Sequence, residues 1–269
     1  MLEIASLGKT YGTGPKATHA IGDVSFTVAD REFVCVVGPS GCGKTTLLKC
    51  VAGLLRPSRG EVLLHGRRVT SPPPEMALVF QEYTRSLMPW TSVRNNVLLP
   101  LRHKKLARRE RATLVDDALE AVGLTRFAQH FPWQLSGGMQ QRVAIARALA
   151  YQPSILLMDE PFASVDAQTR GDLEDLVLQV RDDFGITILF VTHDIDESVY
   201  LADRIVVLTH APTEVKEIVR VDLPLPRDQI ETKELPGFAH LRAHVYRLIK
   251  REQQPAAASE AEPAAVAEA

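Results

Sequence analysis

Residues 33–51 read FVCVVGPSGCGKTTLLKCV, an apolar run, a glycine-rich loop and a second apolar run. The first run, Phe33–Val37, favours a buried strand, and the last, Thr46–Val51, has the spacing of a helix. The loop between them matches the pattern G-x-x-x-x-G-K-[ST] in full, in the strand–loop–helix context where such loops bind phosphate. The loop residues are Gly38, Pro39, Ser40, Gly41, Cys42, Gly43, Lys44, Thr45 and Thr46. The stretch therefore predicts a nucleotide-phosphate site on an α/β fold.

The residue types of this loop suit a nucleoside triphosphate and its metal ion. Glycines let the backbone wrap around phosphates and direct N–H groups inward, and the helix N-terminus adds a favourable dipole. Lys44 is expected to reach the β- and γ-phosphates, and the Thr45 hydroxyl to bind Mg²⁺. A glycine-rich turn without a ligand is the alternative, and the full match disfavours it. The motif alone does not distinguish an ATPase from a GTPase or a kinase.

A second apolar stretch, Ile155–Met158, ends in two acidic residues, Asp159 and Glu160. Asp159 is expected to hold Mg²⁺ through water, and Glu160 to polarise the attacking water as a general base. The alternative is a strand that simply ends in solvated acids. That alternative is weak on a chain that also contains a phosphate-binding loop.

Short apolar segments alternate with helical patterns along the chain, which indicates an α/β fold with a mainly parallel sheet. The expected strands are Glu32–Val37, Ala77–Phe80, Ser154–Met158, Thr187–Thr192 and Arg204–Leu208. The alternation of Val24, Phe26 and Val28 predicts an antiparallel β element beside this sheet. Residues from about 83 to 140 form an expected helical lobe.

The composition is that of a soluble globular protein able to bury a core. Of 269 residues, 45% are hydrophobic and 24% charged, and the net charge of −2 gives no bias toward nucleic acid. The cysteines Cys35, Cys42 and Cys50 favour reduced thiols in a cytosolic setting. The chain has no secretory signal pattern and no apolar run near the ~20 residues that span a bilayer. If the protein acts at a membrane, other subunits are expected to cross it.

The C-terminal part divides into two segments with different patterns. Phe238, Leu241, Val245 and Leu248 fall on one helical face, which predicts a docked helix over residues 236–252. Residues 253–269 are rich in Ala, Glu and Pro and predict a disordered tail. The expected ATPase domain is then residues 1–235.

The segment Leu135–Arg142, LSGGMQQR, predicts a second anion site. Ser136 suits a helix N-cap, and Gly137 and Gly138 would expose backbone N–H groups at the start of a helix that runs to Ala150. This segment resembles the signature motif of the ABC-type ATPases nearly residue for residue, a motif that other proteins with a phosphate-binding loop lack. A capped helix start without a ligand is the disfavoured alternative.

The other motifs of that family follow in order. Tyr11 resembles its adenine-stacking aromatic residue, although a surface tyrosine is a serious alternative. Gln81 resembles the glutamine that contacts Mg²⁺ and water and responds to membrane subunits. Asp166, in Ser164-Val165-Asp166, resembles the D-loop aspartate, where the family more often has Ala-Leu-Asp. His193 resembles the switch histidine that contacts the γ-phosphate.

The resemblance implies a homodimer that hydrolyses MgATP at two sites shared between the chains. Lys44, Gln81, Glu160 and His193 would act on the nucleotide of their own chain, with the metal held by Thr45, Gln81 and Asp159. The residues implied to reach the nucleotide from the signature and D-loop segments are Ser136, Gly137, Gly138, Gln140 and Asp166.

A narrower resemblance points to importers of nitrate, sulfonates and taurine. It rests on Val79–Tyr83, Ser86–Val93 and the C-terminal Pro224–Arg227. It implies a membrane permease partner, an extracytoplasmic solute-binding protein, and a peripheral location on the cytoplasmic face of the membrane. The alternatives are a soluble ABC ATPase acting in DNA repair or translation, and a regulatory module that binds ATP without turnover.

Overall fold

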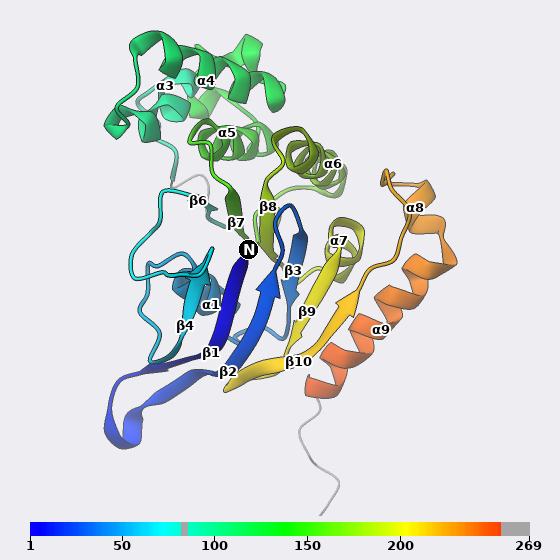
Figure 1. Ribbon diagram of the computed structural model, residues 1–269. Helices are drawn as coiled ribbons and strands as arrows, with labels where there is room; N and C mark the ends of the chain where they lie inside the picture. Colours follow the sequence, from blue (N-terminus) through cyan, green and yellow to red (C-terminus); the bar gives the residue numbers. More distant parts are fainter. Residues whose placement is uncertain (82–85, 254–269) are drawn as a thin grey trace, which may run out of the picture.

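The computed structural model describes residues 1–81 and 86–253. Residues 83–85, at the start of the predicted helical lobe, and residues 254–269 of the predicted tail lie outside the described residues. A single ten-stranded sheet has the order β5-β4-β1-β2-β10-β9-β3-β8-β7-β6 (Figure 1). The helices cover it on both sides and extend beyond the β6–β7 end.

One half of the sheet is parallel and carries the phosphate-binding loop. Its strands are β6 (Met76–Val79), β7 (Ile155–Asp159), β8 (Thr187–Val191), β3 (Phe33–Val37) and β9 (Arg204–Leu208). Every residue of β3, β7 and β8 is buried, as in a parallel sheet covered on both faces. Phe33, Cys35 and Val37 enter one core cluster and Val34 and Val36 the other, because successive side chains alternate across a sheet.

The other half of the sheet is mainly antiparallel. It comprises β1 (Leu2–Tyr11), β2 (Thr18–Val28), β4 (Arg59–Leu64), β5 (Arg67–Arg68) and β10 (Thr213–Arg220). Strand β10 pairs with β9 antiparallel and with β2 parallel, so it joins the two halves. Its alternating exposed charges gave no continuous apolar run, and the sequence did not predict it.

The helices fall into two groups. Helices α1 (Lys44–Val51), α6 (Ala167–Phe184) and α7 (Ile195–Leu201) pack on the sheet. Helices α3 (Val93–Leu98), α4 (Arg108–Ala121) and α5 (Gly137–Ala150) pack together beyond β6 (Figure 1). Short 3₁₀ turns complete this group and the β1–β2 connection: η1 (Gly14–Lys16), η2 (Leu99–His103), η3 (Thr125–Phe127) and η4 (Pro132–Gln134).

The C-terminal residues form α8 (Glu231–Glu234) and α9 (Pro236–Gln253). Helix α9 packs on α7 and on β9, an interior strand of the sheet (Figure 1). Its buried side chains are Phe238, Val245 and Leu248, which belong to the main core cluster. The division of the chain into domains stays a prediction.

Among the described residues, none of the helices has the length and apolar character needed to cross a membrane. The predicted fold class is confirmed, with a mainly parallel core, an antiparallel β part and a helical part.

Candidate nucleotide-binding site

The phosphate-binding loop connects β3 to α1, and glycine is required at its last turn. Gly43 has φ +96°, a left-handed conformation that side chains rarely adopt, and a Cβ there would lie 3.2 Å from the Ala20 carbonyl oxygen. Helix α1 begins at Lys44, two residues earlier than predicted. The loop therefore presents the first backbone N–H groups of α1 to the same space as the Lys44 side chain.

Lys44 is buried within its own loop. Its Nζ donates to the carbonyl oxygens of Gly38, at 2.9 Å, and Pro39, at 3.1 Å. The side chain is only 6% exposed, so these carbonyls offset the cost of desolvating the ammonium group. An ammonium group has three donors, and phosphate oxygens can replace such carbonyl acceptors with stronger charge-assisted bonds.

Thr45 and Asp159 form the part of the site suited to a divalent cation. The Thr45 hydroxyl donates to Asp159 Oδ1 at 3.2 Å, although the two residues are far apart in sequence. Burial of Asp159 raises the pKa of its carboxyl group, and the nearby Glu160 carboxylate acts in the same direction. A cation beside this carboxylate would offset both effects. Hard oxygen ligands of this kind fit Mg²⁺.

Glu160 follows β7 and lies at the centre of a polar cluster. Its Oε2 is 2.9 Å from His193 Nδ1 and accepts from Gln81 Nε2 at 3.5 Å. The backbone of Glu160 is left-handed, with φ +43°, and its N–H donates to the Val191 carbonyl at 2.8 Å. A residue in this conformation stores strain that the surrounding structure must hold. The turn directs the Glu160 carboxylate away from the strand and toward His193.

The phosphate loop, Glu160 and His193 surround one open pocket of about 490 Å³. Asp159 and Gln81 do not line it but contact two residues that do, Thr45 and Glu160. Its lining residues are Ser40, Gly41, Gly43, Lys44, Thr45, Thr46, Glu160 and His193. Tyr11 lies beside the pocket, because its hydroxyl is 3.3 Å from Thr46 Oγ1, and the residue is 43% exposed. The structure thus brings together the phosphate loop, the two acids of β7, Gln81 and His193.

The signature segment lies at the start of α5 and contributes no residue to the lining of this pocket. Ser136 is the N-cap of α5, and its hydroxyl accepts from the Met139 N–H at 3.3 Å. Gly137 is exposed and Gly138 is buried, while the Gln140 side-chain amide donates to the Leu135 carbonyl at 3.2 Å. Among the described residues, no hydrogen bond or ion pair joins the start of α5 to a residue that lines the pocket.

Asp166 is also a helix N-cap in this structure. It accepts from the backbone N–H of Thr169 at 3.0 Å and from the Thr169 hydroxyl at 2.7 Å. These hydrogen bonds hold the pKa of the Asp166 carboxyl below its usual value. Asp166 does not line the pocket.

Gly138 also has a packing role that its motif did not reveal. A Cβ at this position would overlap Thr169 Cγ2 on α6, and rotating Thr169 away would break its bond to Asp166.

We expect Gly138→Ala to lower the free energy of unfolding by about 1–3 kcal/mol, the usual cost of overpacking. Thr169→Ser, which removes only the methyl group, should restore most of that loss in the double variant. Chemical denaturation of the four proteins measures this, and an equal loss in both backgrounds would contradict the packing role.

Thr213 supports the phosphate loop from the unpredicted strand β10. Its hydroxyl donates to the Cys42 carbonyl and lies 3.0 Å from the Ala20 carbonyl, and the residue is 1% exposed. No sequence pattern predicted this contact, because threonine is an ordinary residue in a charged strand.

The Cys42 side chain is buried, and burial raises the pKa of its thiol, which favours a packing role over a reactive one.

A parallel sheet with this loop, a buried acid beside Thr45 and a glutamate–histidine pair defines a P-loop nucleotide hydrolase. The comparisons with known proteins narrow this class. A family model described as ABC transporter matches residues 21–163, more than half of the chain. The chain belongs to the ATP-binding proteins of the ABC transporter family, and it is an ATP-hydrolysing enzyme.

Several relatives match nearly the whole chain. An uncharacterised ABC transporter ATP-binding protein of Methanocaldococcus jannaschii is 45% identical over 251 residues, which cover 93% of this chain and 92% of the relative. The nitrate import ATP-binding protein NrtD of Synechococcus elongatus is 42% identical over 253 residues, with the same two coverages of 93% and 92%. The resemblance to nitrate importers predicted from the sequence is confirmed.

A solved structure of an ATP-binding cassette, dimeric and in a post-hydrolysis state with ADP and Pi, has the same fold. It is 33% identical and has a TM-score of 0.71, covering 82% of this chain and 99% of the cassette.

Proposed function

We propose that this chain is the ATPase subunit of an importer for nitrate or a related small anion such as a sulfonate or taurine. The importer part of the proposal rests on the similarity to the nitrate import ATP-binding protein NrtD. The observation that carries the shared ATPase site is the separation of the signature segment from the pocket. Lys44, Glu160 and His193 line the pocket, whereas Ser136 caps the start of α5, which contributes no residue to the lining. A complete site therefore needs a second copy of the chain, and the relative solved with ADP and Pi is a dimer.

At each composite site, different residues of one chain bind the nucleotide, activate the attacking water and hold the metal ion. Lys44 and the α1 N–H groups bind the β- and γ-phosphates, and Tyr11 covers the adenine. Glu160 accepts a proton from the attacking water, and His193 and Gln81 orient the Glu160 carboxylate. Thr45, Asp159 and Gln81 would hold Mg²⁺, which supplies positive charge that neutralises the developing negative charge on the phosphates.

The partner chain completes the site from the other side. The exposed N-terminus of α5, with Ser136 and Gly137, is an anion site that provides backbone donors without a cation of its own. It would contact the γ-phosphate of the opposite nucleotide, joined by Gly138, Gln140 and Asp166. ATP then stabilises the closed dimer by binding both chains at once, and hydrolysis releases it.

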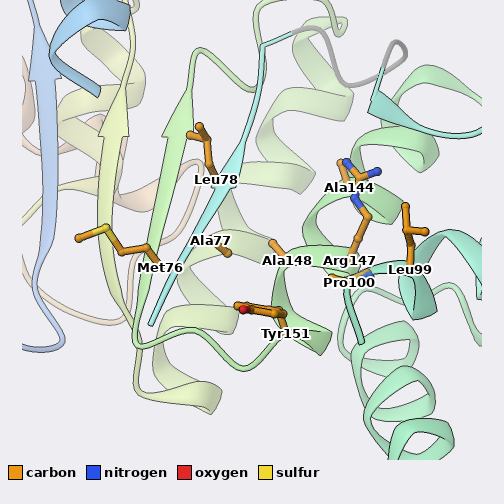
Figure 2. Close-up of a pocket in the computed structure, with 9 residues that line it drawn as sticks. All are labelled: Met76, Ala77, Leu78, Leu99, Pro100, Ala144, Arg147, Ala148 and Tyr151. Atoms are coloured by element: carbon orange, nitrogen blue, oxygen red, sulfur yellow. The ribbon is translucent and has the colours of Figure 1, made fainter. Parts of the chain in front are cut away.

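A groove beside β6 is the place where we expect the membrane permease to dock (Figure 2). It has a volume of about 320 Å³ and lies between β6, η2 and α5. Its lining includes the apolar side chains of Met76 and Leu99, the ring of Tyr151 and the longer, charged side chain of Arg147. Strand β6 ends at Val79, two residues before Gln81, whose side chain contacts Glu160. An apolar permease segment bound in this groove would therefore act on the strand that leads into the site. The subunit would be peripheral at the cytoplasmic face of the membrane, with a solute-binding protein on the other side.

Uptake of labelled solutes by cells tests the proposal. Cells would carry the wild-type chain or Glu160→Gln in place of the native gene, and the solutes would be nitrate, taurine, an alkanesulfonate and an aromatic acid. We expect the variant to lose uptake of one anion by at least about tenfold, because transport without hydrolysis cannot cycle. Unchanged uptake of the whole panel would contradict the importer assignment but not the ATPase activity.

A further inference from the structure

An ion-pair cluster connects the loop that carries Asp166 to the loop that carries His193. We call it the Arg170 cluster, and it consists of Arg170, Thr192, Asp194 and Glu197. Arg170 lies one helical turn after Asp166 on α6, and the other members flank His193 or belong to α7. None of the four lines the nucleotide pocket.

The guanidinium group of Arg170 contacts both loops at once. Its Nη2 donates to the carbonyl oxygen of Val165, the residue before Asp166, at 3.5 Å. Its Nη1 donates to Asp194 Oδ2, the residue after His193, at 3.0 Å. Its Nε lies 3.5 Å from Glu197 Oε1, within ion-pair distance. A planar group with five donors can make these three contacts together, and an ammonium group cannot reach all of them.

The residues on both sides of His193 are held by the same cluster. Thr192 donates from its hydroxyl to Glu197 Oε2 at 2.6 Å, and that hydroxyl accepts from the Asp194 N–H at 2.9 Å. Asp194 also caps α7 through the N–H groups of Asp196 and Glu197. His193 itself is 57% exposed at its side chain, so its position depends on this backbone support and on Glu160.

Because the cluster is partly buried, desolvation of its charged groups offsets much of the stability that its ion pairs contribute. Glu197 is 4% exposed, and burial together with the nearby Asp194 and Glu174 carboxylates raises its pKa to about 7, which Arg170 and the Thr192 hydroxyl oppose. Buried ion pairs often stabilise a fold no better than apolar residues of similar size. A cluster that contacts the neighbours of two site residues is better explained by what it positions.

We infer that Arg170 is a positioning residue for ATP hydrolysis, which fixes the Asp166 loop relative to the His193 loop. The inference rests on the proposed function, because the roles of Asp166 and His193 at the nucleotide belong to that proposal. Asp166 would reach the nucleotide of the opposite chain, while His193 acts on its own. The Arg170 cluster thus connects the two composite sites of a dimer. When the two chains close around one nucleotide, the geometry of the other site changes.

The test is steady-state ATP turnover by the purified full chain carrying Arg170→Lys. The lysine keeps a positive charge beside Glu197, so we expect a Tm within a few degrees of wild type. It loses the contact to Val165 or Asp194, so kcat should fall on the order of tenfold with little change in the KM for ATP, since small misplacements of catalytic groups are costly. Asp194→Asn keeps an oxygen for the α7 cap and removes the anionic partner of Arg170. It should likewise lower kcat with little change in the KM for ATP.

Arg181→Lys is the matched control, because Arg181 is a buried arginine on the same helix that pairs with Asp182 and Asp203. It should lower Tm without lowering kcat. A wild-type kcat in both Arg170→Lys and Asp194→Asn would overturn the inference. So would losses of kcat in these variants that match the loss in Arg181→Lys.

His193→Ala separates the two proposals. If His193→Ala turns over ATP as fast as wild type, the role of His193 in the proposed function fails. If His193→Ala is inactive while Arg170→Lys is fully active, only the positioning inference fails.

Discussion

Glu160→Gln should reduce ATP turnover by at least about 100-fold and leave ATP binding intact. Removal of a general base costs about 10²–10⁴ in rate, because the attacking water then loses its proton acceptor. The glutamine keeps the size of the side chain and an oxygen that can face His193, so the pocket should retain its shape. Because binding without hydrolysis leaves ATP in the site, the variant should accumulate as a dimer with ATP.

Phosphate release measures the turnover, and light scattering with and without ATP measures the dimer. Glu217→Gln is the matched control, because Glu217 also pairs with a histidine, His244, at 2.7 Å but lies outside the pocket. It should hydrolyse ATP at the wild-type rate. A Glu160→Gln protein that binds ATP and stays monomeric would count against the shared site, and one that hydrolyses ATP normally would remove Glu160 from the chemistry.

Gly137→Glu is expected to abolish ATP-driven dimer formation while each chain still binds ATP. Gly137 is exposed at the first position of α5, where an acidic side chain stabilises a helix through its dipole. The fold should therefore tolerate the change or gain slightly. The carboxylate would stand where the phosphates of the opposite nucleotide arrive, and like charges at short range repel strongly in a water-excluded interface.

The measurement is made in the Glu160→Gln background, where ATP otherwise holds the dimer. Gly137→Glu added to it should give a monomer that binds ATP with an affinity within a few-fold of the single variant. Gly137→Ala, which adds no charge, should dimerise. Loss of ATP binding by the monomeric Gly137→Glu chain would show that α5 contributes to the site of its own chain, against the arrangement proposed above.

Residues that work within one short motif could be predicted from the sequence. The spacing of Gly43, Lys44 and Thr45 matters because a single loop surrounds the phosphates, and the structure has that loop between β3 and α1. Asp159 and Glu160 were predicted from a strand end, and in the structure Asp159 is the last residue of β7 and Glu160 follows it. The N-cap role of Ser136 followed from its place before two glycines. In each case, the chemistry depends on neighbours along the chain.

Residues that work through contacts between distant segments could not be predicted. Thr213 reaches the phosphate loop only because β10 enters the sheet between β2 and β9. The sequence assigned no contact to Arg170, because its contacts depend on α6 lying beside the loop before α7. No local pattern encodes such contacts, since they arise from how the sheet and its helices pack.

The sequence by itself determined the class of enzyme, because the phosphate loop, the β7 acids and the signature segment are local patterns with a chemical reason for each residue. Tertiary structure alone decided which of these residues meet. Gln81 and His193 converge on Glu160, since parallel strands bring their C-terminal ends to one edge of the sheet. The same packing leaves Ser136 and Asp166 outside the pocket as helix caps, which is why the proposed function assigns them to the nucleotide of a second chain.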